Sequence, residues 1–357
     1  MTVTGTGNAP DVVDVVALGE SMVTFLPSRP GRLADVPSFD RAIGGAESNV
    51  ACVLAAAGHT TRWVSRVGAD GFGDHLVEAI GAYGVDVSYV RRDPDRPTGV
   101  YFRTAGDRAD DTHEVAYYRA GSAASAMSPA GVDPDAVRAG RVLHLSGITA
   151  ALSPDCLALT RELTAPRPGR PLISFDVNHR PGLWGEGQDP DVLLELARRA
   201  DIVFVGEDEA RQAWGLRGAR AVREALPEPE IVVVKQGKGG AVAFDQDTDG
   251  LCEDADGTAT FVRALHVDVV AAVGAGDAFA AGFLSATLRG LPVRDRLRHG
   301  HLAAAATLTT PGDLAPPPPR PLADRLAALD DAAWGRLRLG PGWTAADAEA
   351  AEEAHTP

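Results

Sequence analysis

The 357-residue sequence predicts an α/β fold in which helices cover a mainly parallel central sheet. Short β-branched runs alternate along the chain with runs rich in alanine and leucine, which is the pattern of repeated strand–helix units. The run 231–234 is apolar throughout, as expected for a central strand that is covered on both faces. Polar or glycine-rich motifs follow several strands, and the ends of parallel strands gather along one edge of a sheet. A hydrophobic content of 45% suffices for a large core.

The individual elements follow from local composition, because strand formers are β-branched and helix formers include alanine and leucine. In chain order, strands are predicted at residues 12–18, 61–67, 141–145, 172–177, 202–205, 231–235 and 241–244. Helices are predicted at residues 47–57, 73–82, 154–163, 191–199, 207–213, 219–226, 277–288 and 293–308. A further strand-like run spans residues 267–273, directly before a glycine-rich turn.

Two segments interrupt the alternation, since residues 22–43 and 98–119 contain strand-like pieces and turn residues but no helix. Both can add strands to one small sheet that projects from the core. Because both end near candidate substrate residues, we interpret this sheet as a lid over the active site; a purely structural side sheet is the alternative. The main domain is expected over residues 14–330. We expect the acidic segment 331–357 to be a poorly ordered tail.

The acidic composition restricts the partners of the chain. A net charge of −15 argues against binding nucleic acid or an anionic membrane surface, so an anionic substrate needs a local basic site. No apolar run is long enough to span a bilayer. Cys52, Cys156 and Cys252 are widely spaced and are interpreted as reduced thiols of a cytoplasmic protein. Lys235 and Lys238 are the only lysines, which reflects either a point charge needed in their loop or chance.

The run 273–279, Val-Gly-Ala-Gly-Asp-Ala-Phe, is the strongest functional signal. Its glycines allow a tight turn, and the helix that follows starts with free backbone N–H groups at the positive end of its dipole. This arrangement, an anion hole, suits a phosphate or the charge on a transferred phosphoryl group. Asp277 stands at its edge, where a base can take a proton from an attacking hydroxyl. The alternative is that Asp277 only caps the helix.

Five other polar or glycine-rich motifs each follow a predicted strand or open a predicted helix. They lie at residues 44–49, 146–149, 176–180, 206–209 and 235–240. Each one alone could be ordinary turn chemistry. All six motifs are expected at the carboxyl edge of the parallel sheet, where ligands bind in such folds. This shared position favours an active site.

These motifs resemble those of the ribokinase, or PfkB, family of small-molecule kinases. The family's two signatures correspond to the glycine pair at 44–45 and to Gly-Ala-Gly-Asp at 274–277. The resemblance runs from about residue 15 to residue 329 and implies a three-layer ribokinase-like fold. Within the family the chain is most similar to 2-keto-3-deoxygluconate kinases. The motifs that carry this similarity are Gly-Gly-Ala-Glu-Ser-Asn at 44–49, Thr-Gly-Val-Tyr at 98–101, Tyr-Tyr-Arg-Ala-Gly-Ser at 117–122, Leu-His-Leu-Ser-Gly-Ile at 143–148 and Phe-Asp-Val-Asn-His-Arg at 175–180.

The resemblance implies roles on the sugar side of the site. Asp277 would be the base, and the backbone N–H groups of Gly274, Ala275 and Gly276 would hold the transferring phosphoryl group. Arg119 and Arg180 would bind the substrate carboxylate, because a guanidinium can meet a carboxylate with two hydrogen bonds. The remaining sugar contacts would come from Gly44, Gly45, Asn49, Tyr101, Tyr117 and Ile148. The alternatives are a surface cation for Arg119 and lid packing for the two tyrosines.

On the nucleotide side, the resemblance implies ATP and Mg²⁺ as cofactors. The residues near the ATP phosphates and ribose would be Asn178, Lys235, Gly237 and Gly239. Glu209 would act on Mg²⁺ through water, since this ion keeps several waters and takes phosphate oxygens. The alternative is that Glu209 only stabilises the start of its helix.

Two positions depart from the family pattern. Gly206 stands where relatives usually carry asparagine, three residues before Glu209. Ala271 stands where relatives often carry an aspartate that contributes to a monovalent-cation site, which argues against a potassium requirement.

The leading hypothesis is a cytoplasmic, ATP-dependent kinase of carbohydrate metabolism that converts 2-keto-3-deoxygluconate to 2-keto-3-deoxy-6-phosphogluconate, the chemistry of the Entner–Doudoroff type. A same-family kinase of a neutral sugar such as fructose or ribose is one alternative, and it would not need the pair Arg119 and Arg180. A non-catalytic sugar or nucleotide sensor is another, although Asp277 and the anion-hole glycines are intact. The sequence leaves open the choice between gluconate and galactonate epimers.

Two further expectations concern other classes of protein and assembly. A dinucleotide-binding oxidoreductase is not expected, because the first strand leads into Gly-Glu-Ser-Met at 19–22 instead of a glycine-rich phosphate turn that opens a helix. The resemblance also implies a homo-oligomer formed through the lid.

Overall fold

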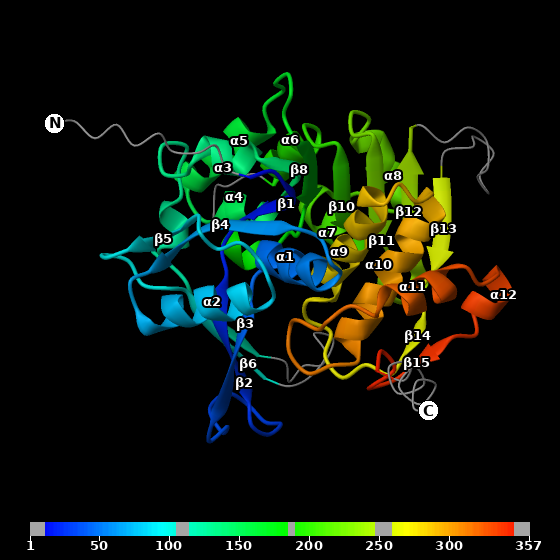
Figure 1. Ribbon diagram of the computed structural model, residues 1–357, viewed down its shortest axis with the longest axis horizontal. Coiled ribbons are helices and arrows are strands. Elements are labelled where there is room, and N and C mark those ends of the chain that lie inside the picture. Colours follow the sequence, from blue (N-terminus) through cyan, green and yellow to red (C-terminus); the bar gives the residue numbers. More distant parts are fainter. Residues whose placement is uncertain (1–10, 105–113, 185–189, 247–258, 346–357) are drawn as a thin grey trace, which may run out of the picture.

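A computed structural model describes residues 11–104, 114–184, 190–246 and 259–345 of the chain (Figure 1). Its middle layer is a nine-stranded sheet with the strand order β13-β12-β11-β10-β9-β8-β1-β4-β5. The strands are β1 (Val13–Leu18), β4 (Thr61–Gly68), β5 (Val90–Asp93), β8 (Gly140–Ser146), β9 (Leu172–Asp176), β10 (Ile202–Gly206), β11 (Ile231–Lys235), β12 (Gly240–Asp245) and β13 (Ala259–Arg263). From β11 to β5 in this order, all neighbouring strands pair in parallel. Strand β12 pairs antiparallel with both β11 and β13. The predicted mainly parallel sheet is confirmed.

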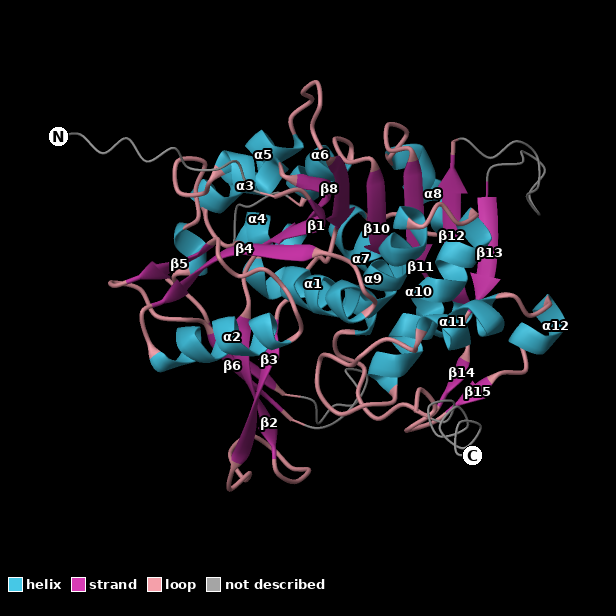
Figure 2. Cartoon of the chain, viewed as in Figure 1, coloured by secondary structure: helices cyan, strands magenta, loops and turns pink. Residues whose placement is uncertain are grey.

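Helices cover both faces of the sheet and complete three layers (Figure 2). One face packs against α1 (Ala46–Ala56), α9 (Ala275–Leu288), α10 (Val293–Leu308) and α11 (Arg320–Ala327). The other face packs against α3 (Pro134–Arg138), α4 (Gly147–Ala151), α5 (Pro154–Thr164), α6 (Asp191–Ala197), α7 (Glu207–Trp214) and α8 (Ala219–Ala225). In β11, Val232 and Val234 contact the second set of helices, whereas Ile231 and Val233 contact the first. Successive strand residues point to opposite faces, so an apolar run is buried on both sides.

A separate four-stranded sheet projects from the body of the molecule (Figure 1). It has the order β3-β2-β6-β7 and consists of β2 (Met22–Pro27), β3 (Phe39–Gly44), β6 (Val100–Arg103) and β7 (Val115–Tyr118). The predicted segments 22–43 and 98–119 supply these strands, although residues 105–113 lie outside the described residues. At its base, α2 (Gly71–Ala82) joins a third apolar cluster with β1, β2 and β4. The predicted small sheet is therefore confirmed.

The strand-like run 267–273 is not a strand of the main sheet. Only β14 (His266–Val267) is extended, and it pairs with β15 (Arg338–Leu339) in a separate two-stranded sheet. Beyond it, the backbone N–H groups of Val270 and Ala271 donate to the carbonyl of Leu308, the last residue of α10. Because these groups bond to a helix end, no ladder forms, and the prediction for this run is wrong. The glycine-rich turn is reached through irregular chain.

The predicted poorly ordered tail is also wrong for residues 331–345. This segment forms α12 (Asp331–Trp334) and β15, and Trp334 is buried. The guanidinium of Arg298 in α10 lies 4.7 Å from the centre of the Trp334 ring, and the indole N–H donates to the carbonyl of Arg263. An aromatic anchor with a hydrogen-bonded N–H fixes the segment to the core despite its acidic composition. Residues 346–357 lie outside the described residues.

Cys52 and Cys156 are buried free thiols, as predicted, while Cys252 lies outside the described residues. In the described part of the chain, no helix has the length and apolar character needed to cross a bilayer.

Candidate active site

Four of the six predicted motifs begin where neighbouring parallel strands end. The register aligns Ser146 at the end of β8 with Asp176 at the end of β9, and Gly206 of β10 with Lys235 of β11. The other two motifs open helices instead: Gly44–Asn49 follows lid strand β3 and starts α1, and the anion-hole glycines start α9. The two helix starts nevertheless meet each other, because the amide of Asn49 donates to Oδ2 of Asp277 over 2.8 Å. The start of α9 also lies beside Lys235 at the end of β11.

Asp277 lies in the first turn of α9, among charged groups at the ends of two strands, β9 and β11. Burial raises the pKa of its carboxyl to about 7, and the nearby Asp176 adds to this. The hydrogen bond from Asn49 and the charges of Lys235 and Arg180 act in the opposite direction. A carboxyl with a pKa near neutral pH can accept a proton and release it again, as a general base must.

The start of α9 is a tight turn. Gly274 is the N-cap and has a φ of 78°, in the left-handed region that favours glycine. A Cβ at Gly274 would overlap the carbonyl oxygen of Asp313. A Cβ at Gly276 would lie 3.5 Å from Nζ of Lys235, so the ammonium group stands beside the first N–H groups of the helix. Together, these donors and this cation make an anion site.

Lys235 has a carboxylate partner that the sequence analysis did not single out. Its Nζ donates to both oxygens of Asp176, over 2.9 and 3.1 Å. Burial raises the pKa of Asp176, and the charge of Lys235 opposes the rise. The signal was present in the sequence, since Asp176 opens the motif at 176–180. The ammonium is thereby held in place between the end of β9 and the start of α9.

Arg180 and Glu209, for which the sequence implied different ligands, bind each other. Nη1 of Arg180 donates to Oε1 of Glu209 over 3.1 Å, and the N–H of Gly206 donates to Oε2 over 3.0 Å. Burial alone would raise the pKa of Glu209, but the charges of Lys235 and Arg180 hold it below its usual value. Glu209 is therefore a charged group at the site that also stabilises the start of α7. Among the described residues, no cluster of three His, Cys, Asp or Glu forms a metal site.

The lid tyrosines differ in their surroundings. Tyr101 is buried, and its hydroxyl donates to Oδ2 of Asp313, whose Oδ1 accepts a hydrogen bond from Arg103 over 3.0 Å. Burial raises the pKa of Tyr101 well above its usual value, so the hydroxyl stays a neutral donor. A Cβ at Gly44 would overlap this hydroxyl. Tyr117 is half exposed and its ring centre lies 5.4 Å from that of Tyr101.

Asp313 is a second acidic residue that the sequence analysis missed. Its side chain joins lid strand β6 through Tyr101 and Arg103, and its backbone touches the turn at Gly274. It follows Pro311-Gly312 in the loop after α10, and a single aspartate in a proline- and glycine-containing loop gives no distinct signal. Asp313 thus connects the lid with the start of α9.

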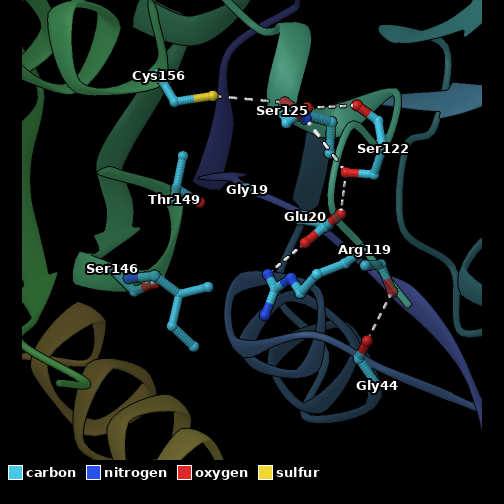
Figure 3. A network of polar contacts seen from close by, with 12 residues as sticks. Gly19, Glu20, Gly44, Arg119, Ser122, Ser125, Ser146, Thr149 and Cys156 are labelled. Carbon is cyan, nitrogen blue, oxygen red and sulfur yellow. Dashed lines mark hydrogen bonds and ion pairs between the residues drawn. The ribbon is translucent and has the colours of Figure 1, made fainter. Parts of the chain in front are cut away.

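Arg119 is not the surface cation of the alternative interpretation. Its side chain is only 9% exposed and forms an ion pair with Glu20, which is fully buried (Figure 3). The guanidinium carbon lies 5.9 Å from the centre of the Tyr117 ring. Its Nε is buried and has no hydrogen-bond partner among the described residues. The two arginines therefore have separate carboxylate partners, Glu20 and Glu209.

The backbone around Ile148 is held by the buried carboxyl group of Glu47. Ile148 is the second residue of α4, and Glu47 accepts hydrogen bonds from Ser146 and Thr149, each over 2.7 Å, on either side of it. Burial raises the pKa of Glu47, while both hydroxyl groups and the charge of Arg119 oppose the rise. Ile148 itself is half buried.

A cavity of about 500 Å³ adjoins the anion hole at Ala275 and Gly276. Its walls include Lys235, Gly237, Gly276 and the apolar residues Val267, Phe279 and Leu308. A second cavity of about 430 Å³ shares Lys235 and Gly237 and also contacts Arg211 and Arg217. Both have the size of a ligand pocket.

Two residues predicted on the nucleotide side, Gly239 and Asn178, line neither of these cavities. Gly239 ends the short 3₁₀ turn Gly237–Gly239. Asn178 has a φ of 40°, which is unusual for a residue other than glycine, and its buried Oδ1 has no hydrogen-bond partner among the described residues. Strained backbone and unpaired buried acceptors gather at functional sites.

Comparisons with known proteins identify a family and several similar chains. The sequence profile of the family described as pfkB family carbohydrate kinase matches residues 13–320. The chain is 35% identical over 308 residues to the 2-dehydro-3-deoxygluconokinase of Bacillus subtilis (strain 168), covering 85% of this chain and 91% of that one. It is 32% identical over 308 residues to the 2-dehydro-3-deoxygalactonokinase of Haloferax volcanii, covering 85% and 93%. The crystal structure of a PfkB protein from Polaromonas sp. JS666 superposes with a TM-score of 0.72 at 34% identity, covering 82% and 95%.

Proposed function

Because the chain belongs to the pfkB family of carbohydrate kinases, we propose that it phosphorylates the primary hydroxyl of 2-keto-3-deoxygluconate, also called 2-dehydro-3-deoxygluconate. The donor is ATP and the product is 2-keto-3-deoxy-6-phosphogluconate. The observation that carries this proposal is the buried guanidinium of Arg119, which keeps an unpaired Nε beside Tyr117. A buried donor without a partner costs free energy unless a ligand takes it, and a substrate carboxylate is the acceptor that suits a guanidinium best.

Asp277 is the group that moves the proton. With the acceptor hydroxyl bound beside it, its carboxylate takes the hydroxyl proton while the oxygen attacks the terminal phosphorus of ATP. The bond from that phosphorus to the bridging oxygen breaks, and ADP leaves with the bridging oxygen. The N–H groups at the start of α9 and the ammonium of Lys235 stabilise the charge that develops on the phosphoryl oxygens. Asn49 orients Asp277 through its 2.8 Å hydrogen bond. Alignment and electrostatic stabilisation account for most of the catalysis in phosphoryl transfer.

The residues present fit ATP and Mg²⁺. The 500 Å³ cavity has apolar walls suited to an adenine ring, and it opens beside Gly276 and Lys235, where phosphates are stabilised. Bound Mg²⁺ neutralises phosphate charge and takes mostly phosphate and water oxygens. Since both oxygens of Glu209 already accept hydrogen bonds, we place its action on the ion through water. We place the enzyme in the cytoplasm, where ATP is supplied.

The projecting sheet acts as a lid in this proposal. Tyr101 reaches from β6 to Asp313 beside the anion hole, so closure of the sheet is linked to the loop that touches Gly274. Closing the site excludes water, which limits hydrolysis of ATP without transfer to the sugar.

Release of ADP by purified protein tests the proposed function. Acceptors are 2-keto-3-deoxygluconate, its galactonate epimer, fructose, ribose and no acceptor, because the relatives of both epimer names match at similar identity. We expect Arg119→Ala and Arg180→Ala to lower kcat/KM for the keto-deoxy acid by roughly 10- to 100-fold, since charge-assisted hydrogen bonds contribute about 1.5–3 kcal/mol. Arg325→Ala, on the exposed side of α11, is the matched control.

Two results would reject this proposal. Faster turnover of fructose or ribose than of either acid would favour the neutral-sugar kinase, and the roles of Arg119 and Arg180 would have to be withdrawn. Binding of sugar and ATP without turnover of any acceptor would favour the sensor.

The activity is expected to depend on the protonation of Asp277. Because burial raises the pKa of this carboxyl to about 7, kcat/KM should rise with pH through neutrality and level off once the base is ionised. Asn49→Ala removes the hydrogen bond that favours the ionised form and should move the profile to higher pH. Initial rates at limiting acceptor between pH 5.5 and 9 measure both profiles. A flat wild-type profile would contradict the assignment of Asp277 as the base.

We also propose that two copies associate through the lid. Tyr118 on lid strand β7 is 66% exposed, and its ring packs edge-on against Phe102 of the neighbouring strand. Exposed aromatic side chains on a projecting sheet suit a protein interface. Sedimentation equilibrium of wild type and Tyr118→Ser tests this association, which a monomeric wild type would exclude.

A further inference from the structure

The carboxylate of Glu20 lies between the core of the molecule and the base of the lid. Glu20 follows β1, whereas its partners Arg119 and Ser122 follow lid strand β7 (Figure 3). Its Oε2 pairs with Nη2 of Arg119, and its Oε1 accepts a hydrogen bond from the hydroxyl of Ser122 over 2.5 Å. Both carboxylate oxygens are thus in use, and the side chain is completely buried. This residue belongs to none of the motifs that the sequence analysis assigned to the site.

This contact uses one nitrogen of the guanidinium. Arg119 donates to Glu20 through Nη2, while its buried Nε has no partner among the described residues. Because the guanidinium is planar and rigid, holding Nη2 also fixes the direction in which the Nε–H points. The unpaired Nε–H is a buried donor that remains for a ligand.

A second buried carboxyl group lies near the same guanidinium. Glu47 feels the charge of Arg119, and its Oε2 is buried without a partner among the described residues. Its other oxygen is already bound to Ser146 and Thr149. Glu47 is therefore a second carboxyl group that attracts Arg119, whereas the direct contact of Arg119 is with Glu20. If the guanidinium of Arg119 turned toward Glu47, it would no longer be available to bind a substrate.

We propose that Glu20 is a positioning residue, which orients Arg119 for the substrate carboxylate and so sets the preference for a sugar acid over a neutral sugar. The inference rests on the proposed function. It differs from the simpler possibility that Glu20 only balances the charge of Arg119. A counter-charge repels a substrate carboxylate, so its removal would strengthen acid binding, whereas loss of an orienting contact weakens it.

Glu20→Gln separates the two roles, because it keeps the shape of the side chain and removes its charge. A charge-assisted hydrogen bond is about twice as strong as a neutral one. We expect KM for 2-keto-3-deoxygluconate to rise roughly tenfold, which corresponds to the loss of about one hydrogen bond. The kcat and the KM for ATP should stay within about threefold of wild type, because the variant leaves Asp277 and the anion hole intact. Glu195→Gln, which removes the carboxylate from an ion pair with Arg161 on the surface, is the matched control.

A double mutant tests whether Glu20 acts through Arg119. If it does, Glu20→Gln adds almost nothing to the loss already caused by Arg119→Ala. Additive losses, or a KM for the acid that is unchanged or lower in Glu20→Gln, would overturn the proposal. A merely structural role would instead lower Tm and affect all substrates alike.

Crystal structures of wild type and Glu20→Gln give a readout that needs no turnover. We expect the guanidinium of Arg119 to leave its wild-type position in the variant, and an unmoved Arg119 would also overturn the proposal. If the proposed function fails instead, wild type will not turn over the acid, although Arg119 will still be displaced in the variant. The two failures are therefore distinguishable.

Discussion

Replacing Asp277 with asparagine is expected to lower kcat by roughly two to four orders of magnitude, the usual contribution of a general base. The amide has nearly the shape of the carboxyl but cannot take a proton from the acceptor hydroxyl. The KM values should change much less, because the proposed binding contacts come from the arginines, the lid and the nucleotide cavity. Steady-state kinetics with saturating ATP measure the loss, and single-turnover rates show whether the chemical step is the one affected.

The same variant should be more stable than wild type at alkaline pH. Folding raises the pKa of Asp277 from 3.8 to about 7, so the folded state holds this proton more tightly than the unfolded chain does. This group's contribution to stability therefore falls as pH rises between these values and stays low above pH 7. Asp277→Asn removes the buried charge, so its Tm should exceed that of wild type at pH 8 and differ less at pH 5. Wild-type kcat, or a Tm below wild type at pH 8, would contradict these assignments.

Gly274→Ala is expected to have the second largest effect. The φ of 78° is strained for alanine, at roughly 1–2 kcal/mol, and the added methyl group would overlap the carbonyl oxygen of Asp313. Either the start of α9 or the loop of Asp313 must move. Movement of α9 misaligns the anion-hole donors, and movement of Asp313 disturbs its contacts with Tyr101 and Arg103 in the lid. We expect kcat/KM to fall by about 10²–10³, as when one oxyanion donor is lost.

Gly290→Ala is the matched control for this variant. Gly290 follows the other end of α9 with a φ of 70°, but the described residues leave the space around its added Cβ empty to 4 Å. It therefore shares the backbone strain without the overlap, and its Tm should fall slightly while its kinetics stay near wild type. Equal activity of the two variants would show that the position of the α9 start is not critical for transfer. Thermal unfolding of both variants separates lost activity from lost folding.

Most of the fold could be predicted because its signals are local. The alternation of β-branched and alanine-rich runs identified seven strands of the main sheet and the eight helices α1, α2, α5, α6, α7, α8, α9 and α10. The errors have non-local causes. The run 267–273 is apolar enough for a strand, yet its backbone bonds to the end of α10. Residues 331–345 look like a solvated tail, yet Trp334 is anchored by Arg298 and by the carbonyl of Arg263.

The sequence by itself determined which motifs make up the candidate site: the glycine turn before Asp277, the motifs at the strand ends and the helix starts are properties of a few consecutive residues. Only the tertiary structure decided how these groups are paired. It joined Arg119 to Glu20, Arg180 to Glu209 and Tyr101 to Asp313, across 99, 29 and 212 positions of the chain. Residue type and spacing leave such partners open, because an ion pair or hydrogen bond requires its atoms within about 3 Å, and only the packed chain brings distant residues that close.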